Sequence, residues 1–409
     1  MTLISACRAC DAPDLAAILS LGNTPLANSL RHPDSSDAPE LTYPLDVVFC
    51  RSCSLVQLTE TVDPEILFRD YLYLSSFSDT MLRHASDLVS SLIEDRALGP
   101  NNLAVEIASN DGYLLKNYVA AGVPVLGIEP ATNVARIAEE QGIRTRNDFF
   151  NARLARMLVS EGYGADVIHA HNVLAHVADL HGVVEGIVTL LDKNGVAVLE
   201  MPYVKDMIDQ VEFDTIYHEH LCYFSLTAIN RLFQRHGLTV TKVDRVPIHG
   251  GTLRVFASHA GQAAVADRSV AALLEEESSW ATNPEAYARF GDRVVTIGAE
   301  LRRMIAELKA AGKRVAAYGA AAKGSTLLNY LGIGRESLDF VVDRSTFKQG
   351  LLMPGVHIPI LPPEALLDRR PDYVLLLSWN FADEIMHQQA DYRALGGQFI
   401  LPVPFPRVV

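Results

Sequence analysis

From about residue 100, short apolar runs alternate with helix-like stretches of about ten to fifteen residues, and this alternation constrains the fold most strongly. The runs are LAVEI (103–107), PVLGIEP (124–130), ADVIHA (165–170) and GVAVLEMP (195–202). Strands joined by helices of this length form a parallel sheet with right-handed crossovers. The middle of the chain is therefore expected to be a doubly wound α/β domain.

A second unit of the same kind begins at about residue 313. Its strand-like runs are KRVAAYG (313–319), LDFVVDRS (338–345), DYVLLLSW (372–379) and QFILPVP (398–404). Between the two units, apolar residues recur every three or four positions, which predicts one long helix with a packing face: Tyr287, Phe290, Val294, Ile297, Leu301, Met304 and Leu308. A chain of 409 residues is also too long for one ordinary core.

Two cysteine pairs, Cys7/Cys10 and Cys50/Cys53, occupy a loop-rich N-terminal region. Two C-x2-C knuckles supply four thiolates, enough to close a tetrahedral zinc site with no open position. The predicted zinc is therefore structural. The alternatives are four buried free thiols or a redox pair, and neither pair opens a βαβ unit as a redox motif would. We expect three parts: a zinc-binding module (1–70), a central domain (71–245) and a C-terminal α/β domain (246–409).

The bulk composition excludes several classes of function. A net charge of −14 argues against a broad nucleic-acid interface, which needs clustered Lys and Arg. No apolar run approaches the length of a membrane span, and the N-terminal residues lack the pattern of a secretory signal. A cytoplasmic enzyme acting on a small molecule is the expectation, and a monomer suffices because three domains can form a cleft.

The turn after the first strand, Ala108-Ser109-Asn110-Asp111-Gly112, lies where open parallel sheets bind ligands. Glu129 ends the next strand, seventeen residues after Gly112, where an acid would accept ribose hydroxyls. One glycine is too few for the G-x-G-x-x-G approach to a pyrophosphate. S-adenosylmethionine, which has a ribose and no phosphate, fits this turn better than NAD or FAD. A purely structural turn is the alternative.

Two further segments lie at later strand ends of the central domain. In NDFF (147–150), Asn147 is a candidate for adenine N6 and Phe149 for the adenine ring, although such a Phe is often core. In HNVLAHV (171–177), Asn172 is a cofactor candidate and His176 is a candidate to face the cleft; the alternative for His176 is helix packing.

The run FDTIYHEHLCYFS (213–225) contains the densest cluster of titratable side chains. On a regular strand, His218 and His220 would share one face and Glu219 would take the other. Such a pair lacks a third metal ligand, whereas a histidine oriented by a carboxylate suits general acid/base catalysis. An aromatic core strand is the remaining alternative.

The turn GAAAKGST (319–326) of the second unit is suited to an anion. It is not a Walker A loop, because the order is Lys323-Gly324, yet a lysine, a small-residue turn and hydroxyls such as that of Ser325 precede or open a helix. Asp343 ends the next strand. A nucleotide diphosphate is the expected occupant, with Arg254 of HGGTLRV (249–255) as a second contact; a close-packed turn and an ordinary hairpin are the alternatives.

Taken together, these stretches resemble the zinc-containing, S-adenosylmethionine-dependent C-methyltransferases of deoxysugar and antibiotic biosynthesis. The resemblance spans the chain through the two CxxC pairs, YLYLSSFSDTM (71–81), VEIASNDGYLL, GIEPA, NVLAHV, YHEHLCYFS, HGGTLRV and YGAAAKG. It implies a class I methyltransferase domain followed by a Rossmann-like nucleotide-sugar domain. By matching positions, it implies zinc ligands at the four cysteines, a cofactor site at Ala108, Asn110, Gly112 and Glu129, and catalytic residues Tyr71, His176, Tyr217, Glu219 and His220.

The resemblance further implies C-methylation, at C3 or else at C5, of a dTDP-linked 4-keto-deoxysugar. In that reaction His220 is the expected base, and Lys323 is the expected phosphate contact. The rival functions are an NAD-dependent nucleotide-sugar oxidoreductase or epimerase, an O- or N-methyltransferase, and a non-enzymatic sensor of S-adenosylmethionine or nucleotide.

Overall fold

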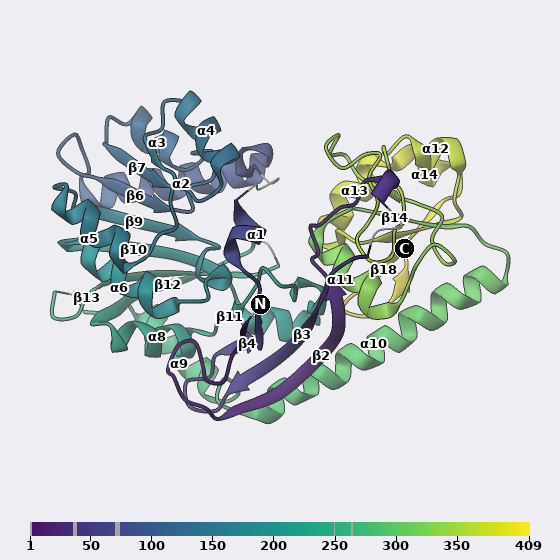
Figure 1. Cartoon of the computed structure of the whole chain (residues 1–409), viewed down its shortest axis with the longest axis horizontal. Helices are drawn as coiled ribbons and strands as arrows, with labels where there is room; N and C mark the ends of the chain where they lie inside the picture. Colours follow the sequence, from purple (N-terminus) through teal and green to yellow (C-terminus); the bar gives the residue numbers. More distant parts are fainter. Residues whose placement is uncertain (1, 36–38, 70–73, 249, 263–264) are drawn as a thin grey trace.

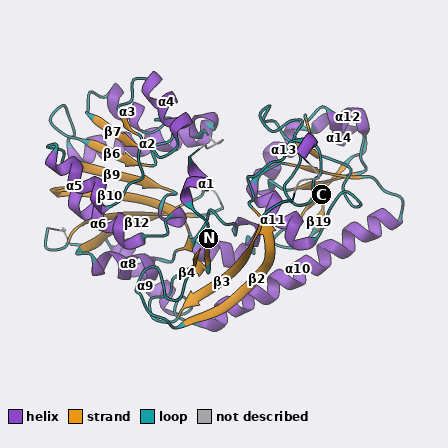
Figure 2. Ribbon diagram, in the orientation of Figure 1, coloured by secondary structure: helices purple, strands orange, loops and turns teal. Residues whose placement is uncertain are grey.

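The computed structural model describes residues 2–35, 39–69, 74–248, 250–262 and 265–409. Two α/β lobes stand side by side (Figures 1 and 2). Below them in this view run the 27-residue helix α10 (Pro284–Ala310) and the long strands β2 (Leu15–Pro25) and β3 (Thr42–Cys50). The expected packing face of α10 is confirmed, since Tyr287, Phe290, Val294, Ile297 and Leu301 are all buried.

The first lobe is built on a seven-stranded sheet with the order β12-β13-β10-β9-β6-β7-β8. Its strands are β6 (Ala104–Ile107), β7 (Val125–Ile128), β8 (Thr145–Arg146), β9 (Ala165–His171), β10 (Leu191–Pro202), β12 (Leu238–Val246) and β13 (Thr252–His259). Strands β6 to β10 pair in parallel, and β13 is antiparallel to both of its neighbours. The predicted doubly wound α/β fold is confirmed.

The helices of this lobe are α2 (Asp79–Arg96), α3 (Leu115–Ala120), α4 (Thr132–Glu140), α5 (Ala152–Ser160), α6 (Leu180–Leu190), α7 (Val204–Gln210), α8 (Leu226–Arg235) and α9 (Arg268–Ser278). Helix α2 shows why they dock. Its buried residues recur at three- and four-residue spacing, which gives one apolar stripe: Met81, Ala85, Leu88, Val89 and Leu92. Ser78 caps its N-terminus by accepting from the Met81 N–H at 3.3 Å.

The sheet of the first lobe also runs across the domain boundary expected between residues 245 and 246. A division between residues 245 and 246 falls at the last residue of β12, and β13 inserts between β12 and β10 and hydrogen-bonds to both. The first lobe therefore includes β13 and, with helix α9 packed beside β12, extends to Ser278. The sequence shows a turn at this point, but a turn inside a hairpin and a turn between domains have the same residue types.

The N-terminal module has a sheet of its own, with the order β11-β4-β3-β2. Strand β4 (Val56–Leu58) pairs with β3 and with β11 (Cys222–Tyr223), which comes from the first lobe. A short pair of strands, β1 (Thr2–Leu3) and β5 (Glu60–Thr61), and helix α1 (Pro64–Phe68) complete the module. The region expected to be rich in loops is thus built largely of strands, and its four-stranded sheet includes β11 of the first lobe.

The second lobe contains a six-stranded sheet with the order β16-β15-β14-β17-β18-β19. Its elements are β14 (Val315–Tyr318), α11 (Ala322–Leu331), β15 (Val341–Val342), β16 (Ile360–Leu361), α12 (Ala365–Arg369), β17 (Tyr373–Leu376), α13 (Ala382–Gln388), α14 (Ala390–Ala394), β18 (Gln398–Leu401) and β19 (Arg407–Val408). All neighbouring strands pair in parallel except β18 and β19. The Rossmann-like C-terminal α/β domain is confirmed.

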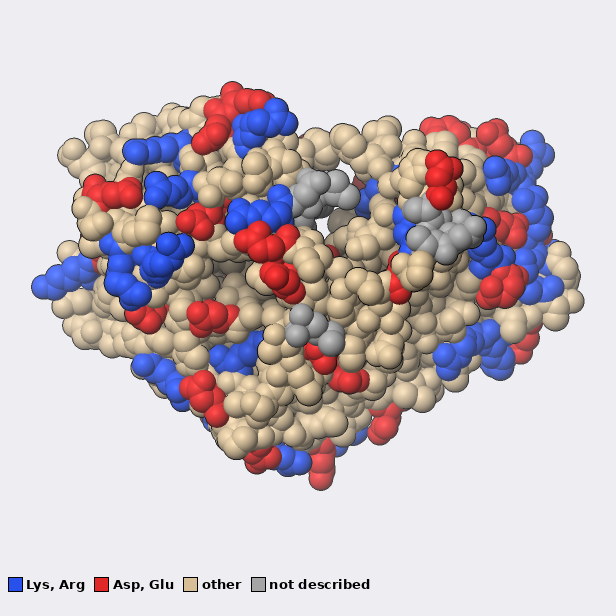
Figure 3. Space-filling view, viewed as in Figure 1, with Lys and Arg blue, Asp and Glu red and all other residues tan. Residues whose placement is uncertain are grey.

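Figure 3 shows a recess between the two lobes and charges of both signs interspersed over the face in view. Across the part of the chain that the structure describes, none of the helices is long and apolar enough to cross a bilayer.

Candidate active site

The turn after β6 has the backbone of a ligand-binding turn. Ala108 and Asn110 have left-handed φ values of 52° and 51°, and Gly112 has 79°. Non-glycine residues in this region are strained and cluster at functional sites. Gly112 has a second constraint, because an added Cβ would lie 2.7 Å from Cγ1 of Ile143. A glycine is therefore required at the one position where the sequence has it.

Glu129, at the end of β7, holds this turn in place. Its Oε2 accepts from the Asn110 N–H and its Oε1 from the Ala131 N–H, both at 2.8 Å. Each carboxyl oxygen keeps a second lone pair for a ligand hydroxyl. Burial raises the pKa of Glu129, while its two backbone donors act to lower it.

Two buried polar atoms of the turn lack a hydrogen-bond partner among the described residues: Oδ1 of Asp111 and Oγ of Ser109. Asp111 is only 1% exposed. A buried carboxyl group with an unused oxygen needs a donor or a cation. The ammonium and sulfonium groups of S-adenosylmethionine meet this need, so the turn fits the predicted cofactor.

Asn147 and Phe149, the residues expected to contact adenine, differ in how well they fit that expectation. The amide of Asn147 donates to the carbonyls of Glu129 (2.7 Å) and Pro130 (3.1 Å), so it fixes the loop after β7 and is not free for adenine. Phe149 is half-buried, and the guanidinium of Arg69 lies 5.0 Å from its ring centre. Asn172, directly after β9, is left-handed (φ 55°) and donates its backbone N–H to the backbone carbonyl of Glu200 at 2.8 Å.

A segment N-terminal to α2 covers this turn, and the sequence analysis did not assign its backbone a role. The Ser75 N–H donates to Oδ1 of Asn110 (2.8 Å) and the Ser76 N–H to Oδ2 of Asp111 (3.3 Å). Nearer the adenine edge, Arg69 donates to the Pro130 carbonyl at 3.2 Å. Tyr71, the tyrosine predicted to be catalytic, lies outside the described residues.

The 217–220 run forms a turn and not the strand considered above. The His220 N–H donates to the Tyr217 carbonyl at 2.8 Å. Nδ1 of His220 lies 2.8 Å from the Thr215 carbonyl, so this nitrogen carries the proton. Nε2 of His220 lies 2.8 Å from the Tyr217 hydroxyl, which can donate to it when the ring is neutral. This tautomer is the one that a general base requires.

His176, at the end of the 3-10 turn Leu174–His176, faces His220, with ring centres 4.8 Å apart. Burial lowers the pKa of His176 to about 4, so the ring is neutral at physiological pH. The structure thus brings together the two histidines that the sequence proposed from segments 44 residues apart.

Glu219 points toward the N-terminal module. Its Oε1 accepts from the side-chain amide of Asn28 at 2.7 Å, and burial raises its pKa to about 7. At neutral pH this carboxyl is therefore poised between donor and acceptor forms. Asn28 is a candidate site residue that sequence reasoning missed, because it lies 191 residues away from its partner.

His218, unassigned from the sequence, turns away from the cleft. It is 2% exposed, and its Nε2 contacts the carbonyls of Tyr43 (3.3 Å) and Pro44 (3.2 Å) on β3. These contacts connect the 217–220 turn to the N-terminal module.

The four cysteines converge as predicted. Their sulfur atoms all lie within 4.8 Å of one another, with Cys7 and Cys53 at 3.4 Å and Cys10 and Cys50 at 3.5 Å, and all four are free thiols. An all-sulfur set with this spacing fits a tetrahedral Zn²⁺ and leaves no open position.

In the second lobe, Nζ of Lys323 is buried, lies 4.6 Å from the ring centre of Trp379, and has no hydrogen-bond partner among the described residues. Burial raises the pKa of Glu212 to about 7 and that of Asp214 to about 6, and the nearby Lys323 ammonium opposes both shifts. Lys323 therefore lies at the joint between the lobes, where Asp214 also accepts from the Trp379 indole at 2.6 Å.

The other residues predicted to bind phosphate, Asp343, Ser325 and Arg254, have different surroundings from Lys323. Asp343 accepts from the N–H groups of Ala320 (2.7 Å) and Ser345 (2.8 Å), so it closes the turn, as Glu129 does in the first lobe. Oγ of Ser325 is buried without a hydrogen-bond partner among the described residues. Arg254 does not fit the expectation, because it lies on β13 of the first lobe with its Nε 2.6 Å from Glu200.

Comparison with known proteins agrees with this geometry. Family models match as a zinc binding domain (residues 7–68), a methyltransferase domain (81–243) and a C-methyltransferase C-terminal domain (247–404). The chain is 37% identical over 407 residues to the C-methyltransferase NovU of Streptomyces niveus, covering 99% of this chain and 97% of that protein.

Among solved structures, an S-adenosylmethionine-dependent methyltransferase from Clostridium acetobutylicum matches 44% of this chain and 92% of its own (12% identity, TM-score 0.36). Magnesium protoporphyrin IX methyltransferase from Synechocystis, solved with bound S-adenosylmethionine, matches 48% of this chain and 89% of its own (13% identity, TM-score 0.34).

The fold and the cofactor turn define an S-adenosylmethionine-dependent methyltransferase that carries a structural zinc module. With the full-length similarity to NovU, the chain belongs to the zinc-containing C-methyltransferase family. The oxidoreductase, O- or N-methyltransferase and sensor alternatives are therefore set aside.

Proposed function

We propose that this C-methyltransferase methylates C3 of a dTDP-linked 4-keto-deoxysugar. The observation that carries the proposal is the state of His220, whose Nδ1 proton is held by the Thr215 carbonyl and whose Nε2 lone pair faces the Tyr217 hydroxyl. A C-methyltransferase must turn a C–H bond into a carbon nucleophile, and a histidine whose unprotonated Nε2 can accept that proton is a suitable base for this step.

In the proposed reaction, Nε2 of His220 takes the C3 proton of the sugar. The electron pair of that C–H bond moves into the ring to give an enolate, with its negative charge on the oxygen at C4. S-adenosylmethionine, when bound, supplies the electrophilic methyl group that C3 accepts as the methyl–sulfur bond breaks.

In this proposal, three side chains stabilise the enolate oxygen. Tyr217 offers a hydroxyl beside His220, neutral His176 faces the His220 ring, and the protonated form of Glu219 is a donor at neutral pH. Donors that meet charge only as it develops contribute most to the rate. Ala108, Asn110, Gly112, Asp111 and Glu129 would hold the cofactor.

The dTDP moiety is assigned to the second lobe. Helix α11 begins without a side-chain cap, so its first N–H groups are open to an anion, and Lys323 follows at its second residue. A phosphate would give the buried Lys323 ammonium the hydrogen-bond partner that it lacks among the described residues. Methylation at C5 is the second candidate, because the 4-keto group acidifies both neighbouring positions.

The test is to incubate the zinc-loaded enzyme with methyl-labelled S-adenosylmethionine and a panel of dTDP-4-keto-deoxysugars, and to locate the label by NMR. Label on C3 supports the proposal, label on C5 selects the second candidate, and label on oxygen refutes both. Solvent deuterium entering C3 in the absence of methyl donor would identify the base step separately.

A further inference from the structure

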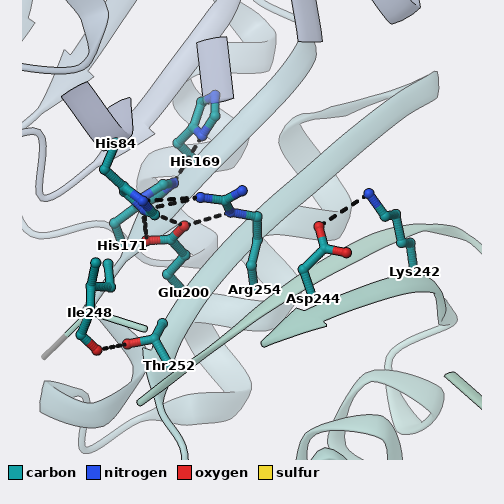
Figure 4. A network of polar contacts seen from close by, with 9 residues as sticks. All are labelled: His84, His169, His171, Glu200, Lys242, Asp244, Ile248, Thr252 and Arg254. Atoms are coloured by element: carbon teal, nitrogen blue, oxygen red, sulfur yellow. Dashed lines mark hydrogen bonds and ion pairs between the residues drawn. The ribbon is translucent and has the colours of Figure 1, made fainter. Parts of the chain in front are cut away.

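A row of buried polar side chains crosses the sheet of the first lobe, apart from the catalytic turn (Figure 4). His171 on β9, Glu200 on β10 and Arg254 on β13 are cross-strand neighbours and share one face. Nδ1 of His171 lies 3.1 Å from Oε2 of Glu200, and Nε of Arg254 lies 2.6 Å from Oε1. The Glu200 carboxylate is fully buried.

The row continues through His169 to Tyr118. The Tyr118 hydroxyl lies 2.9 Å from Nε2 of His169, and Nδ1 of His169 lies 3.0 Å from Nε2 of His171. Burial lowers the pKa of His169 well below its usual range, so the ring is neutral and carries one N–H group. When the Tyr118 hydroxyl donates to Nε2, this N–H is at Nδ1 and donates to Nε2 of His171. Burial acts to raise the pKa of Glu200, but His171, His84 and Arg254 together lower it, so Glu200 is the anion of the row.

His84 reaches this carboxylate from helix α2, outside the sheet. Its Nε2 lies 2.8 Å and 2.9 Å from the two oxygens of Glu200, and its side chain is 11% exposed. His84, His171 and Glu200 resemble a metal-ligand set. Arg254 argues against a metal, because its Nη2 lies 3.0 Å from Nε2 of His84 and would face any dication there.

The bond from His84 to Glu200 fixes helix α2 to the sheet, and the sheet does not need this bond to compensate the Glu200 charge. Without it, Glu200 would still have Arg254 and His171, so the buried charge would stay compensated. Helix α2 begins just after Ser75 and Ser76, whose N–H groups meet the cofactor-turn side chains of Asn110 and Asp111. His84 lies on the same helix, six residues beyond the Ser78 cap, so its bond to Glu200 fixes the helix close to this covering segment.

We propose that His84 and Glu200 form a latch that holds α2, and with it the segment Ser75–Ser78, in position over the S-adenosylmethionine site. His84 is a positioning residue, since it acts through Ser75 and Ser76 and not on the reacting atoms. The latch depends on the cofactor and not on the sugar proposed above, so a failure of the sugar assay would leave it standing.

The test uses His84→Ala, because removing Glu200 would strand Arg254 and His171 in the interior. S-adenosylmethionine binding to the zinc-loaded, full-length protein is measured by calorimetry, and amide hydrogen exchange is measured over residues 74–82 without cofactor. We expect affinity to fall about tenfold, as for one hydrogen bond to a charged group, and exchange of the Ser75 and Ser76 amides to become faster. His84→Gln, which retains a donor, should restore both.

His259→Ala is the matched control, because Nε2 of His259 bonds to the Leu191 carbonyl on the same sheet without touching α2. It should leave affinity and exchange at 74–82 unchanged. Equal affinity and exchange in His84→Ala and the unmodified protein would overturn the proposal, as would an equal loss in the His259 control. A second zinc equivalent in the unmodified protein, absent from His84→Ala, would overturn it in favour of a metal site.

Discussion

At the scale of single residues, the catalytic proposal depends on one short turn. Tyr217 and His220 lie three positions apart on the same side, and the carbonyl of Thr215 fixes which ring nitrogen carries the proton. His218 points the other way, into β3. Neighbouring residues in this run therefore have unrelated tasks, one chemical and one structural.

His220→Asn removes the proposed base while keeping a side chain of similar shape. We expect kcat to fall by about 10²–10⁴, the usual contribution of general base catalysis, with S-adenosylmethionine binding unchanged. Steady-state kinetics and calorimetry measure the two quantities. A kcat within a factor of ten of the unmodified enzyme would contradict the assignment.

Glu219 predicts a pH dependence. Its pKa of about 7 means that it is a hydrogen-bond donor below this pH and an acceptor above it. We expect kcat/KM to fall as pH rises through 7, and Glu219→Gln, which remains a donor at every pH, to lose this limb of the profile. An unchanged limb in the Gln variant would show that another group titrates there.

The same raised pKa predicts an effect on stability. The folded protein keeps the Glu219 proton that the unfolded chain releases above about pH 4.3, so this group lowers the free energy of unfolding as pH rises from about 4.3 to 7. Thermal melts of Glu219→Gln across this range should therefore slope less steeply than those of the unmodified protein. Parallel slopes would count against a buried, titrating Glu219.

At the scale of elements, the zinc module shares a sheet with the strand that follows the proposed catalytic turn. Strand β4 lies beside the second cysteine knuckle and pairs with β11, which begins two residues after His220. From the sequence alone, loss of zinc predicts a folding defect without a chemical one. The shared sheet changes this expectation.

Cys50→Ser should lower the zinc content and also lower kcat, because β4 would no longer hold β11 and the turn before it. Metal analysis and single-turnover kinetics on the folded fraction provide the measurement, and Cys222→Ser, a buried cysteine outside the zinc set, is the control. Normal kcat in folded, zinc-free Cys50→Ser would show that the two sites are independent.

The elements also show how far sequence reasoning reaches. The α/β alternation predicted both Rossmann-like lobes, since strand and helix periods are local, and the cysteine spacing predicted the metal site. The β12–β13 hairpin, the pairing of β4 with β11, and the Asn28–Glu219 contact were missed because each depends on residues brought together by packing. Arg254 was misplaced for the same reason: a Gly-Gly turn followed by an arginine does not reveal which sheet the next strand joins.

At the scale of the whole molecule, the proposed substrate spans both lobes, with the sugar at the catalytic turn and the nucleotide at α11. Binding energy from a remote group can be used to position the reacting carbon. We therefore expect the corresponding 4-keto-deoxysugar phosphate, without the nucleotide, to react with kcat/KM at least about 10³-fold lower. Equal kcat/KM values for the two substrates would remove the second lobe from substrate recognition.

The sharing of one sheet by the N-terminal module and the first lobe has a consequence for biosynthesis. Gln57 of β4 pairs with Cys222, so this edge of β4 can form its backbone hydrogen bonds only after 165 more residues have been translated. At about 5–20 residues per second this interval lasts roughly 8–33 s. During that time β4 presents unpaired backbone groups, which are a template for pairing with another chain. The β4 edge is therefore exposed to mispairing until β11 has been translated.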